Sequence, residues 1–185
     1  MRIADKIYFS PSLRLEMLDL NNKNQLIENF NERITKYFIE PIEALNHSEN
    51  AFAAGSLLTL LIDALSRYTT TENGSEKRMV KWCIDNLKVD KSTGTMFYEH
   101  FRCGLLHESH IKSLGQFTYD IEFAKSMTIE KNCLIVNPKC LFDDINKYFD
   151  EFIQLLKKDD SIYQIFLSRI KIDFEQEINT LLTTS

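Results

Sequence analysis

Apolar side chains recur at intervals of three and four residues along most of the chain, and this periodicity predicts amphipathic α-helices. In the first such segment Leu26, Phe30 and Ile34 share one face. The segment at about residues 48–68 is apolar almost all round, so we expect it in the middle of a helical bundle. The predicted helices cover about residues 22–40, 48–68, 75–87, 96–107, 138–158 and 162–181.

Capping and helix-breaking residues set the limits of these helices. Pro41 should end or kink the first helix, because proline lacks an N–H and clashes with the preceding turn. The polar cluster Ser92–Thr95 indicates a break and the start of the fourth helix. Asn137 fits the N-cap of the fifth helix. The pattern Ser161-x-x-Gln164 resembles a capping box at the start of the last.

Two segments depart from the helical pattern. Residues 117–121 alternate apolar and polar side chains, which indicates a strand, and residues 133–136 form a short apolar run of the same type. We expect the two to pair as a small β-hairpin, with residues 122–132 between them. Residues 1–20 are interpreted as an extended arm or a short helix packed on the body.

The composition favours long helices over loop-rich folds. The chain of 185 residues has only five glycines and three prolines, well under the roughly 12% that the two contribute to average proteins. With 44% hydrophobic residues, one core can form without disulfides or metal. We therefore predict an all-α fold in one domain over residues 1–185, a bundle of about six helices with a small inserted β-hairpin.

The net charge of −5 excludes a protein that coats nucleic acid by general phosphate neutralisation. Any nucleic-acid function must therefore depend on a local site. One stretch, residues 71–91, is slightly basic and either forms a solvated face or steers RNA. Its cations are Lys77, Arg78, Lys81, Lys88 and Lys91.

The pattern of apolar residues predicts neither a signal peptide nor a membrane-spanning helix. No uninterrupted apolar stretch that would serve as a signal peptide follows Met1. The most apolar run, residues 51–62, is shorter than the about 20 residues that span a bilayer. The four cysteines contain no CxxC pair and are interpreted as reduced thiols, with a zinc site made from all four as the alternative. We expect a cytoplasmic protein with no membrane partner.

One short segment concentrates titratable side chains. His100, His107 and His110 lie within eleven residues, with Arg102 among them. A guanidinium binds phosphate through its planar fork of donors, and an imidazole moves protons near neutral pH. Together they can cleave RNA without metal: His107 takes the proton from the 2′-hydroxyl or gives one to the leaving 5′-oxygen, while Arg102 stabilises the developing charge. DNA lacks the 2′-hydroxyl and should be inert.

The spacing of this pair is a difficulty for a straight α-helix. Five residues at about 100° each place Arg102 and His107 about 140° apart around the helix. Gly104 lies between them and allows the helix to bend or end there. Alternatively, a two-fold dimer brings two copies of the pair into one cleft.

The run from Arg102 to His107, with the sequence RCGLLH, resembles the R-x4-6-H motif of the HEPN superfamily of small helical proteins. The order of features is similar too: an apolar central helix, a further helix, then the motif helix. The resemblance covers about residues 22–114, and the hairpin and last two helices, about 115–185, lie outside it.

The resemblance implies a metal-independent endoribonuclease of a toxin–antitoxin or antiphage-defence system, without a cofactor. It implies a homodimer with the motif at its interface. Arg102 and His107 would be the catalytic pair. RNA would be the substrate, and an antitoxin or defence-system protein the partner.

Other interpretations stay open. Cys103 stands where the family often has Asn, Asp or His after the arginine. This departure favours a catalytically inactive HEPN-like module that dimerises or binds a partner protein or a nucleotide. Arg102 would then pair with Glu99 or stack on Tyr98, and His107 would be a helix-end histidine stabilised by the dipole.

A third interpretation is a zinc site. His100, Cys103 and His107 fall at i, i+3 and i+7, on one face of an α-helix, as metal ligands would. A fourth ligand would come from more distant residues. The candidates are His110, Cys133 and Cys140.

Several residues are candidates for supporting the Arg102/His107 pair. Asp63 lies inside the most apolar helix, where a carboxylate needs a partner. That partner is either Arg67, four residues on, or Arg102 or His107 across the bundle. Glu108 is either a surface carboxylate or orients the pair. The supporting candidates are Asp63, Tyr98, Glu108 and His110.

Overall fold

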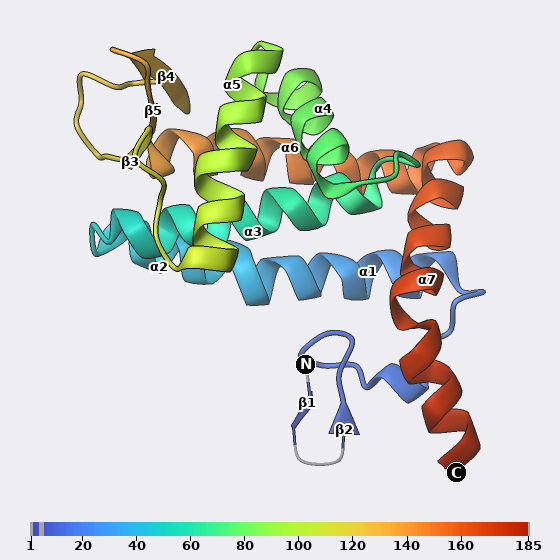
Figure 1. Cartoon of the computed structure of the whole chain (residues 1–185). Helices are drawn as coiled ribbons and strands as arrows, with labels where there is room; N and C mark the ends of the chain where they lie inside the picture. Colours follow the sequence, from blue (N-terminus) through green and yellow to red (C-terminus); the bar gives the residue numbers. More distant parts are fainter. Residues whose placement is uncertain (1, 4–5, 185) are drawn as a thin grey trace.

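The computed structural model describes residues 2–3 and 6–184, which form six continuous helices, one short 3-10 turn and two small sheets (Figure 1). This confirms a mostly helical fold with the predicted number of helices. Two of the six helices include π-helical turns, η2 in one and η3 and η4 in the other, whereas η1 is the 3-10 turn. The helical bounds are η1 Leu15–Met17, α1 Lys23–Ile34, η2 Thr35–Ile39, α2 Glu40–His47, α3 Ala51–Tyr68, α4 Ser75–Leu87, α5 Lys91–Met96, η3 Phe97–Arg102, η4 Gly104–Glu108, α6 Pro138–Lys158 and α7 Asp160–Thr184.

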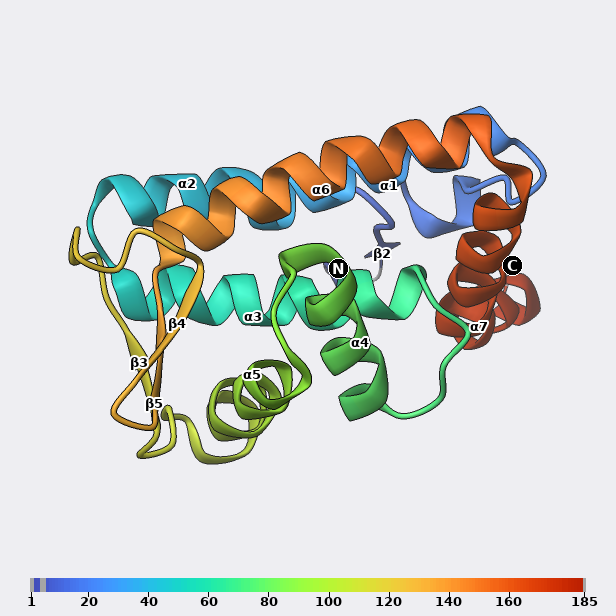
Figure 2. The same ribbon diagram turned by 90° about the horizontal axis from the view of Figure 1, so that it is seen from above.

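The apolar helix α3 lies at the centre of the molecule, as predicted. It packs against α2, α4, α6 and α7, and against η3 and strand β3 (Gly115–Phe117). Figure 2 shows α1, α2 and α6 on one side of α3 and α4 and α5 on the other. Its side chains Leu58, Leu61 and Ile62 are fully buried. Neither α3 nor any other helix in the described part of the chain is both long and apolar enough to cross a membrane.

Helix α6 is part of the same core. It packs against α1, α2 and α3, and buries Leu141, Ile145 and Phe149. Asn137 caps it as predicted, because its side-chain oxygen accepts backbone N–H groups of the first turn. The core that surrounds α3 therefore extends beyond the region of the HEPN resemblance, residues 22–114.

Pro41 does not end the first helix, and that part of the prediction is wrong. The helix continues to His47. The turn just before the proline, η2 (Thr35–Ile39), is wound as π-helix, and the N–H of Glu40 bonds to the carbonyl of Thr35 five residues back. This wider turn takes up the distortion that a proline imposes on the preceding turn.

Two helix starts also differ from the predictions. The cluster Ser92–Thr95 is not a break: Asp90 caps the helix, and its carboxylate accepts a backbone N–H of that cluster at 2.7 Å. At the last helix the capping box at Ser161 does not form. Asp159 accepts the backbone N–H groups of Ser161 and Ile162 at 2.8 and 3.2 Å instead. In both cases the N-cap is an aspartate that precedes the predicted helix, and its carboxylate accepts the free N–H groups of the first turn.

The sheet topology was not predicted. The three-stranded sheet has the order β3-β5-β4, with β3 parallel and β4 antiparallel to the central β5. A two-stranded antiparallel hairpin, β1-β2, lies near the N-terminus. The strand bounds are β1 Arg2–Ile3, β2 Lys6–Ile7, β3 Gly115–Phe117, β4 Met127–Glu130 and β5 Cys133–Val136.

The predicted hairpin between residues 117–121 and 133–136 is therefore wrong. The hairpin partner of β5 is β4, and the two are joined by Lys131 and Asn132, which have φ of 49° and 65°. A two-residue turn with both φ positive matches the twist of antiparallel strands. The alternation at 117–121 was misleading, because Ile121 is 89% exposed.

The prediction for residues 1–20 is confirmed for the described part of the N-terminal arm, which packs on the body; residues 1, 4 and 5 lie outside the described residues. Phe9 and Leu15 are buried in the core. The ring of Phe9 meets that of Phe174 on α7 edge to face, with centroids 5.2 Å apart. The described part of the arm thus packs against α1 and α7.

Candidate functional site

The helix that carries the Arg102/His107 motif starts as α5 and continues as π-helix. In η3 and η4 the backbone hydrogen bonds run five residues back. The N–H of Cys103 bonds to the carbonyl of Tyr98, and the N–H of Ser109 bonds to that of Gly104. π-Helical turns are rare in proteins, and those that occur are often found at functional sites.

The π-helical winding changes the relation between the two motif residues. A turn closed by hydrogen bonds five residues back holds about one residue more than the 3.6 of an α-helix. Residues five apart therefore lie nearly above one another instead of about 140° apart. Arg102 and His107 are five apart, so this winding brings their positions around the helix closer together than a regular α-helix would.

Gly104 marks the point where the chain folds back on the motif helix. A Cβ at this position would lie 2.5 Å from the carbonyl oxygen of His110, closer than a side chain can approach. The helix ends at Ser109, whose φ is 59°, and the N–H of Lys112 bonds to the carbonyl of His100 at 3.0 Å. The end of the motif helix is therefore fixed by backbone contacts.

Arg102 binds the aspartate of the central helix. Its Nε and Nη2 donate to Oδ2 of Asp63 at 3.3 and 3.2 Å. The guanidinium also lies over the ring of Tyr98, 5.5 Å from its centroid. Of the two partners predicted for Asp63, the one across the bundle is therefore correct, and the neighbouring Arg67 pairs with Asp173 on α7.

The Arg102–Asp63 pair is half-buried, with 17% and 20% of the two side chains exposed. Burial works against the charged form of Arg102, but the charge and hydrogen bonds of Asp63 outweigh it and raise the pKa of Arg102. The guanidinium is thus held ionised in a fixed position. The remaining oxygen of Asp63, Oδ1, is buried and has no hydrogen-bond partner among the described residues.

His107 is exposed and makes no hydrogen bond or ion pair with any described side chain. Glu108 and His110 do not orient it. Glu108 instead binds Lys112 at 3.0 Å, and that hydrogen bond lowers the pKa of Glu108. Nδ1 of His110 donates to the carbonyl of Glu108 at 3.0 Å. Within one chain, then, Arg102 faces Asp63 while the imidazole of His107 faces solvent.

The zinc interpretation gains no support. In the described part of the chain no three His, Cys, Asp or Glu side chains are arranged to hold a metal ion. The stripe of His100, Cys103 and His107 assumed α-helical spacing, and the π-helical turns remove that alignment. All four cysteines are free.

Sequence reasoning missed a group of arginines beside the Arg102–Asp63 pair. Arg67 makes a two-point ion pair with Asp173, its Nε lying 2.7 and 2.8 Å from the two carboxylate oxygens. Arg169 on α7 donates to two backbone carbonyls of the α3–α4 loop. Both act electrostatically on Arg78 of α4, as Arg102 does. No local pattern indicates that α7 meets α3 and α4 here. The basic stretch predicted at residues 71–91 includes Arg78 but none of the other three arginines.

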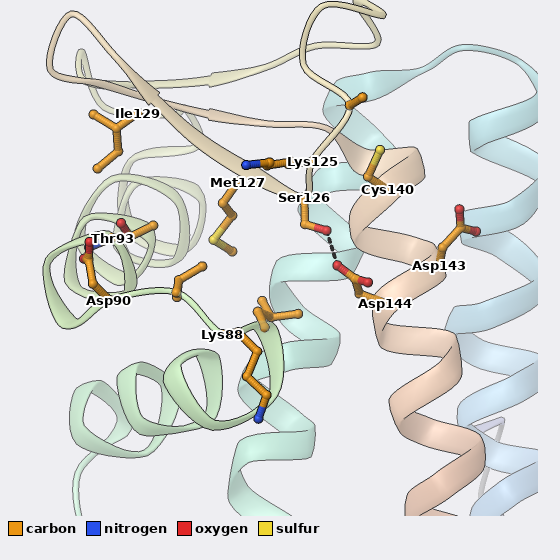
Figure 3. Close-up of a pocket in the computed structure, with 13 residues that line it drawn as sticks. Lys88, Asp90, Thr93, Lys125, Ser126, Met127, Ile129, Cys140, Asp143 and Asp144 are labelled. Carbon is orange, nitrogen blue, oxygen red and sulfur yellow. Dashed lines mark hydrogen bonds between the residues drawn. The ribbon is translucent and has the colours of Figure 1, made fainter.

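A cleft of about 670 Å³ lies elsewhere, between the α4–α5 loop, the segment that leads into β4, and α6 (Figure 3). In it the hydroxyl of Ser126 donates to the carboxylate of Asp144. Neither Arg102 nor His107 lines this cleft. The cleft is therefore separate from the two motif residues, although Thr93 near the start of the same helix lines it.

Comparisons with known proteins add no assignment to this geometry. No family model matches the chain, and neither a characterised protein nor a solved structure matches it significantly.

Proposed function

We propose that the chain is a metal-independent endoribonuclease of HEPN type, acting in the cytoplasm as a toxin or antiphage-defence effector. The observation that carries the proposal is the arrangement of the motif helix. It holds the ionised guanidinium of Arg102 between Asp63 and Tyr98 and presents the exposed imidazole of His107 five residues later, in a π-helical stretch of the same helix.

Each residue has a distinct role in the proposed reaction. His107 accepts the proton of the 2′-hydroxyl, whose oxygen attacks the adjacent phosphorus. The bond to the 5′-oxygen then breaks, and that oxygen takes a proton from water, while the imidazolium of His107 returns its proton to solvent. Arg102 donates hydrogen bonds to the phosphoryl oxygens as negative charge develops on them. Asp63 is a positioning residue, because it touches Arg102 and not the RNA. The products are a 2′,3′-cyclic phosphate and a 5′-hydroxyl.

A second copy of the chain completes the proposed site. Arg102 lies half-buried and His107 lies in solvent, so an RNA strand held between two motif helices meets both groups. Leu106, beside His107, is 45% exposed, and Leu114 is 43% exposed. These apolar side chains suit a self-complementary contact around a two-fold axis.

The test is RNA cleavage in EDTA by the purified chain. We expect the wild-type protein to cleave single-stranded RNA and to leave DNA of the same sequence intact. Removal of the general base in His107→Ala should slow cleavage about 10²- to 10⁴-fold, and Arg102→Ala about 10²- to 10³-fold. The matched control is His47→Ala, which removes an exposed histidine from the end of α2. Equal cleavage by all four proteins would refute the assignment.

One observation favours a second candidate, a catalytically inactive HEPN-like module that dimerises or binds a partner protein or a nucleotide. The guanidinium of Arg102 is already engaged by Asp63 and Tyr98, as it would be in a purely structural role. This candidate predicts no RNA cleavage under any condition but a stable dimer in sedimentation. Growth arrest on expression, abolished by His107→Ala, would contradict it.

A further inference from the structure

The arginines beside the motif helix outnumber the carboxylates that pair with them. The cluster consists of Arg67, Arg78, Arg102 and Arg169, with the carboxylates Asp63 and Asp173 between them. Each carboxylate is paired with one arginine, and Arg169 donates only to backbone carbonyls. Two cations therefore remain without a carboxylate contact among the described residues, in a chain whose net charge is −5.

Arg78 is the least compensated member. Its Nε is buried with no hydrogen-bond partner, and the guanidinium makes no ion pair with any described residue. Burial lowers the pKa of Arg78, and the neighbouring arginines lower it further, against the opposing effect of Asp63. A half-buried cation beside other cations is unfavourable unless an anion binds there.

Arg78 also borders an opening to solvent. Together with Thr69, Thr70 and Lys81 it lines a cleft of about 260 Å³ between α4, α6 and the start of α7. Lys81 is paired with Asp85, so Arg78 is the cation in this cleft that lacks a carboxylate partner. The cleft is smaller than the about 300 Å³ at which pockets for complete small-molecule ligands begin. Its size suits one phosphate group with the adjoining sugar.

We propose that Arg78 binds a backbone phosphate of single-stranded RNA next to the phosphate that Arg102 holds, and that Arg67 and Arg169 add positive charge nearby without lining the cleft. The planar guanidinium fork matches the oxygens of a phosphodiester. Arg102 belongs to the same cluster, so a strand that reaches Arg78 also approaches the motif helix. The inference rests on the proposed function and names how the substrate is held.

The experiment measures binding separately from cleavage. A fluorescent single-stranded RNA with 2′-O-methyl groups throughout has no free 2′-hydroxyl and remains intact. Its Kd for the full-length chain is measured by anisotropy over a range of salt concentrations. The variants are Arg78→Ala and Arg78→Lys, and the matched control is Arg14→Ala, because Arg14 pairs with Glu16 outside this cluster.

We expect Arg78→Ala to raise Kd by about 5- to 10-fold and to reduce the slope of log Kd against log salt by about 0.7, the value for one phosphate contact on a single strand. Arg78→Lys should lie between Arg78→Ala and the wild type, because it keeps the charge without the fork. Arg14→Ala should bind like the wild type. The melting temperature of Arg78→Ala should equal or exceed that of the wild type, since the substitution removes an uncompensated charge.

Three outcomes would overturn the inference. The wild-type chain does not bind the RNA, or Arg78→Ala leaves Kd and the salt slope unchanged, or ATP raises the melting temperature in an Arg78-dependent way while no RNA binds. The last would indicate a mononucleotide site.

The outcomes separate this inference from the proposed function. If Arg78-dependent binding occurs but natural RNA is not cleaved, the phosphate site stands and the nuclease proposal fails. If natural RNA is cleaved but RNA binding does not depend on Arg78, the nuclease proposal stands and the phosphate site fails.

Discussion

The pair between Arg102 and Asp63 offers the sharpest test of how the motif residue is held. Asp63→Asn keeps the size of the side chain and removes its charge, so Arg102 loses its ion pair and keeps at most a neutral hydrogen bond. Arg102 would remain half-buried without a compensating charge. We therefore expect a loss of stability, together with weaker catalysis because the guanidinium is no longer fixed.

The size of the loss follows from the exposure of the pair. Exposed pairs contribute about 0–1 kcal/mol, whereas removal of one partner of a fully buried pair costs about 3–5 kcal/mol. With 17% and 20% of the two side chains exposed, Arg102–Asp63 lies between these limits. We expect about 1–2 kcal/mol of lost unfolding free energy for Asp63→Asn. This corresponds to a melting temperature about 2–8 °C lower for a chain of this size.

Urea unfolding, followed by circular dichroism, measures this loss. The matched control is Asp85→Asn, which breaks the exposed pair of Asp85 with Lys81 and should change stability by less than about 0.5 kcal/mol. A cycle with Arg102→Gln isolates the coupling between the two residues. Equal stabilities for Asp63→Asn and Asp85→Asn, or no coupling in the cycle, would refute the reasoning. A fall in kcat of RNA cleavage at a temperature where Asp63→Asn is folded would show that Asp63 also positions Arg102.

Three further predictions concern other parts of the fold. Gly104→Ala should destabilise the chain by about 1–3 kcal/mol in urea unfolding, because its Cβ would meet the carbonyl of His110 at 2.5 Å; unchanged stability would contradict this. Burial raises the pKa of the Cys83 thiol to about 12, so Cys83 should resist iodoacetamide at pH 8 in the folded chain and react in urea, as mass spectrometry would show. Burial opposes the charge of Glu32, but hydrogen bonds from two serines of the N-terminal arm prevail and lower its pKa below 4.5. That stabilisation is present above pH 4.5 and lost as pH falls through the folded pKa, so the melting temperatures of wild type and Glu32→Gln should converge in acid.

Local sequence patterns were sufficient wherever burial and caps alone define an element. The range predicted for α4, residues 75–87, matches the structure, and Asn137 caps α6 as expected. The apolar residues of α3 placed it in the centre. These features depend on side-chain periodicity and on N–H groups at helix ends, both of which are visible in the sequence.

Features that depend on distant contacts were not predictable in this way. Winding as π-helix before Pro41 and through the motif has no periodic signal of its own. The strand β4 was missed because Lys131 and Asn132 lack the glycine of the commonest two-residue turns. The sequence did not decide which partner Asp63 binds. Arg102 is its partner because the motif helix packs on α3. The arginine cluster forms because α7 meets α3 and α4, which no local pattern indicates.

The most direct test of the central claim is the chemistry of the RNA ends after incubation in EDTA. If Arg102 and His107 act through the 2′-hydroxyl, mass spectrometry will find 2′,3′-cyclic phosphate and 5′-hydroxyl ends, and one 2′-deoxy substitution at a cleavage position will protect that position. Fragments with 3′-hydroxyl and 5′-phosphate ends, or the same fragments from His107→Ala, would contradict the account.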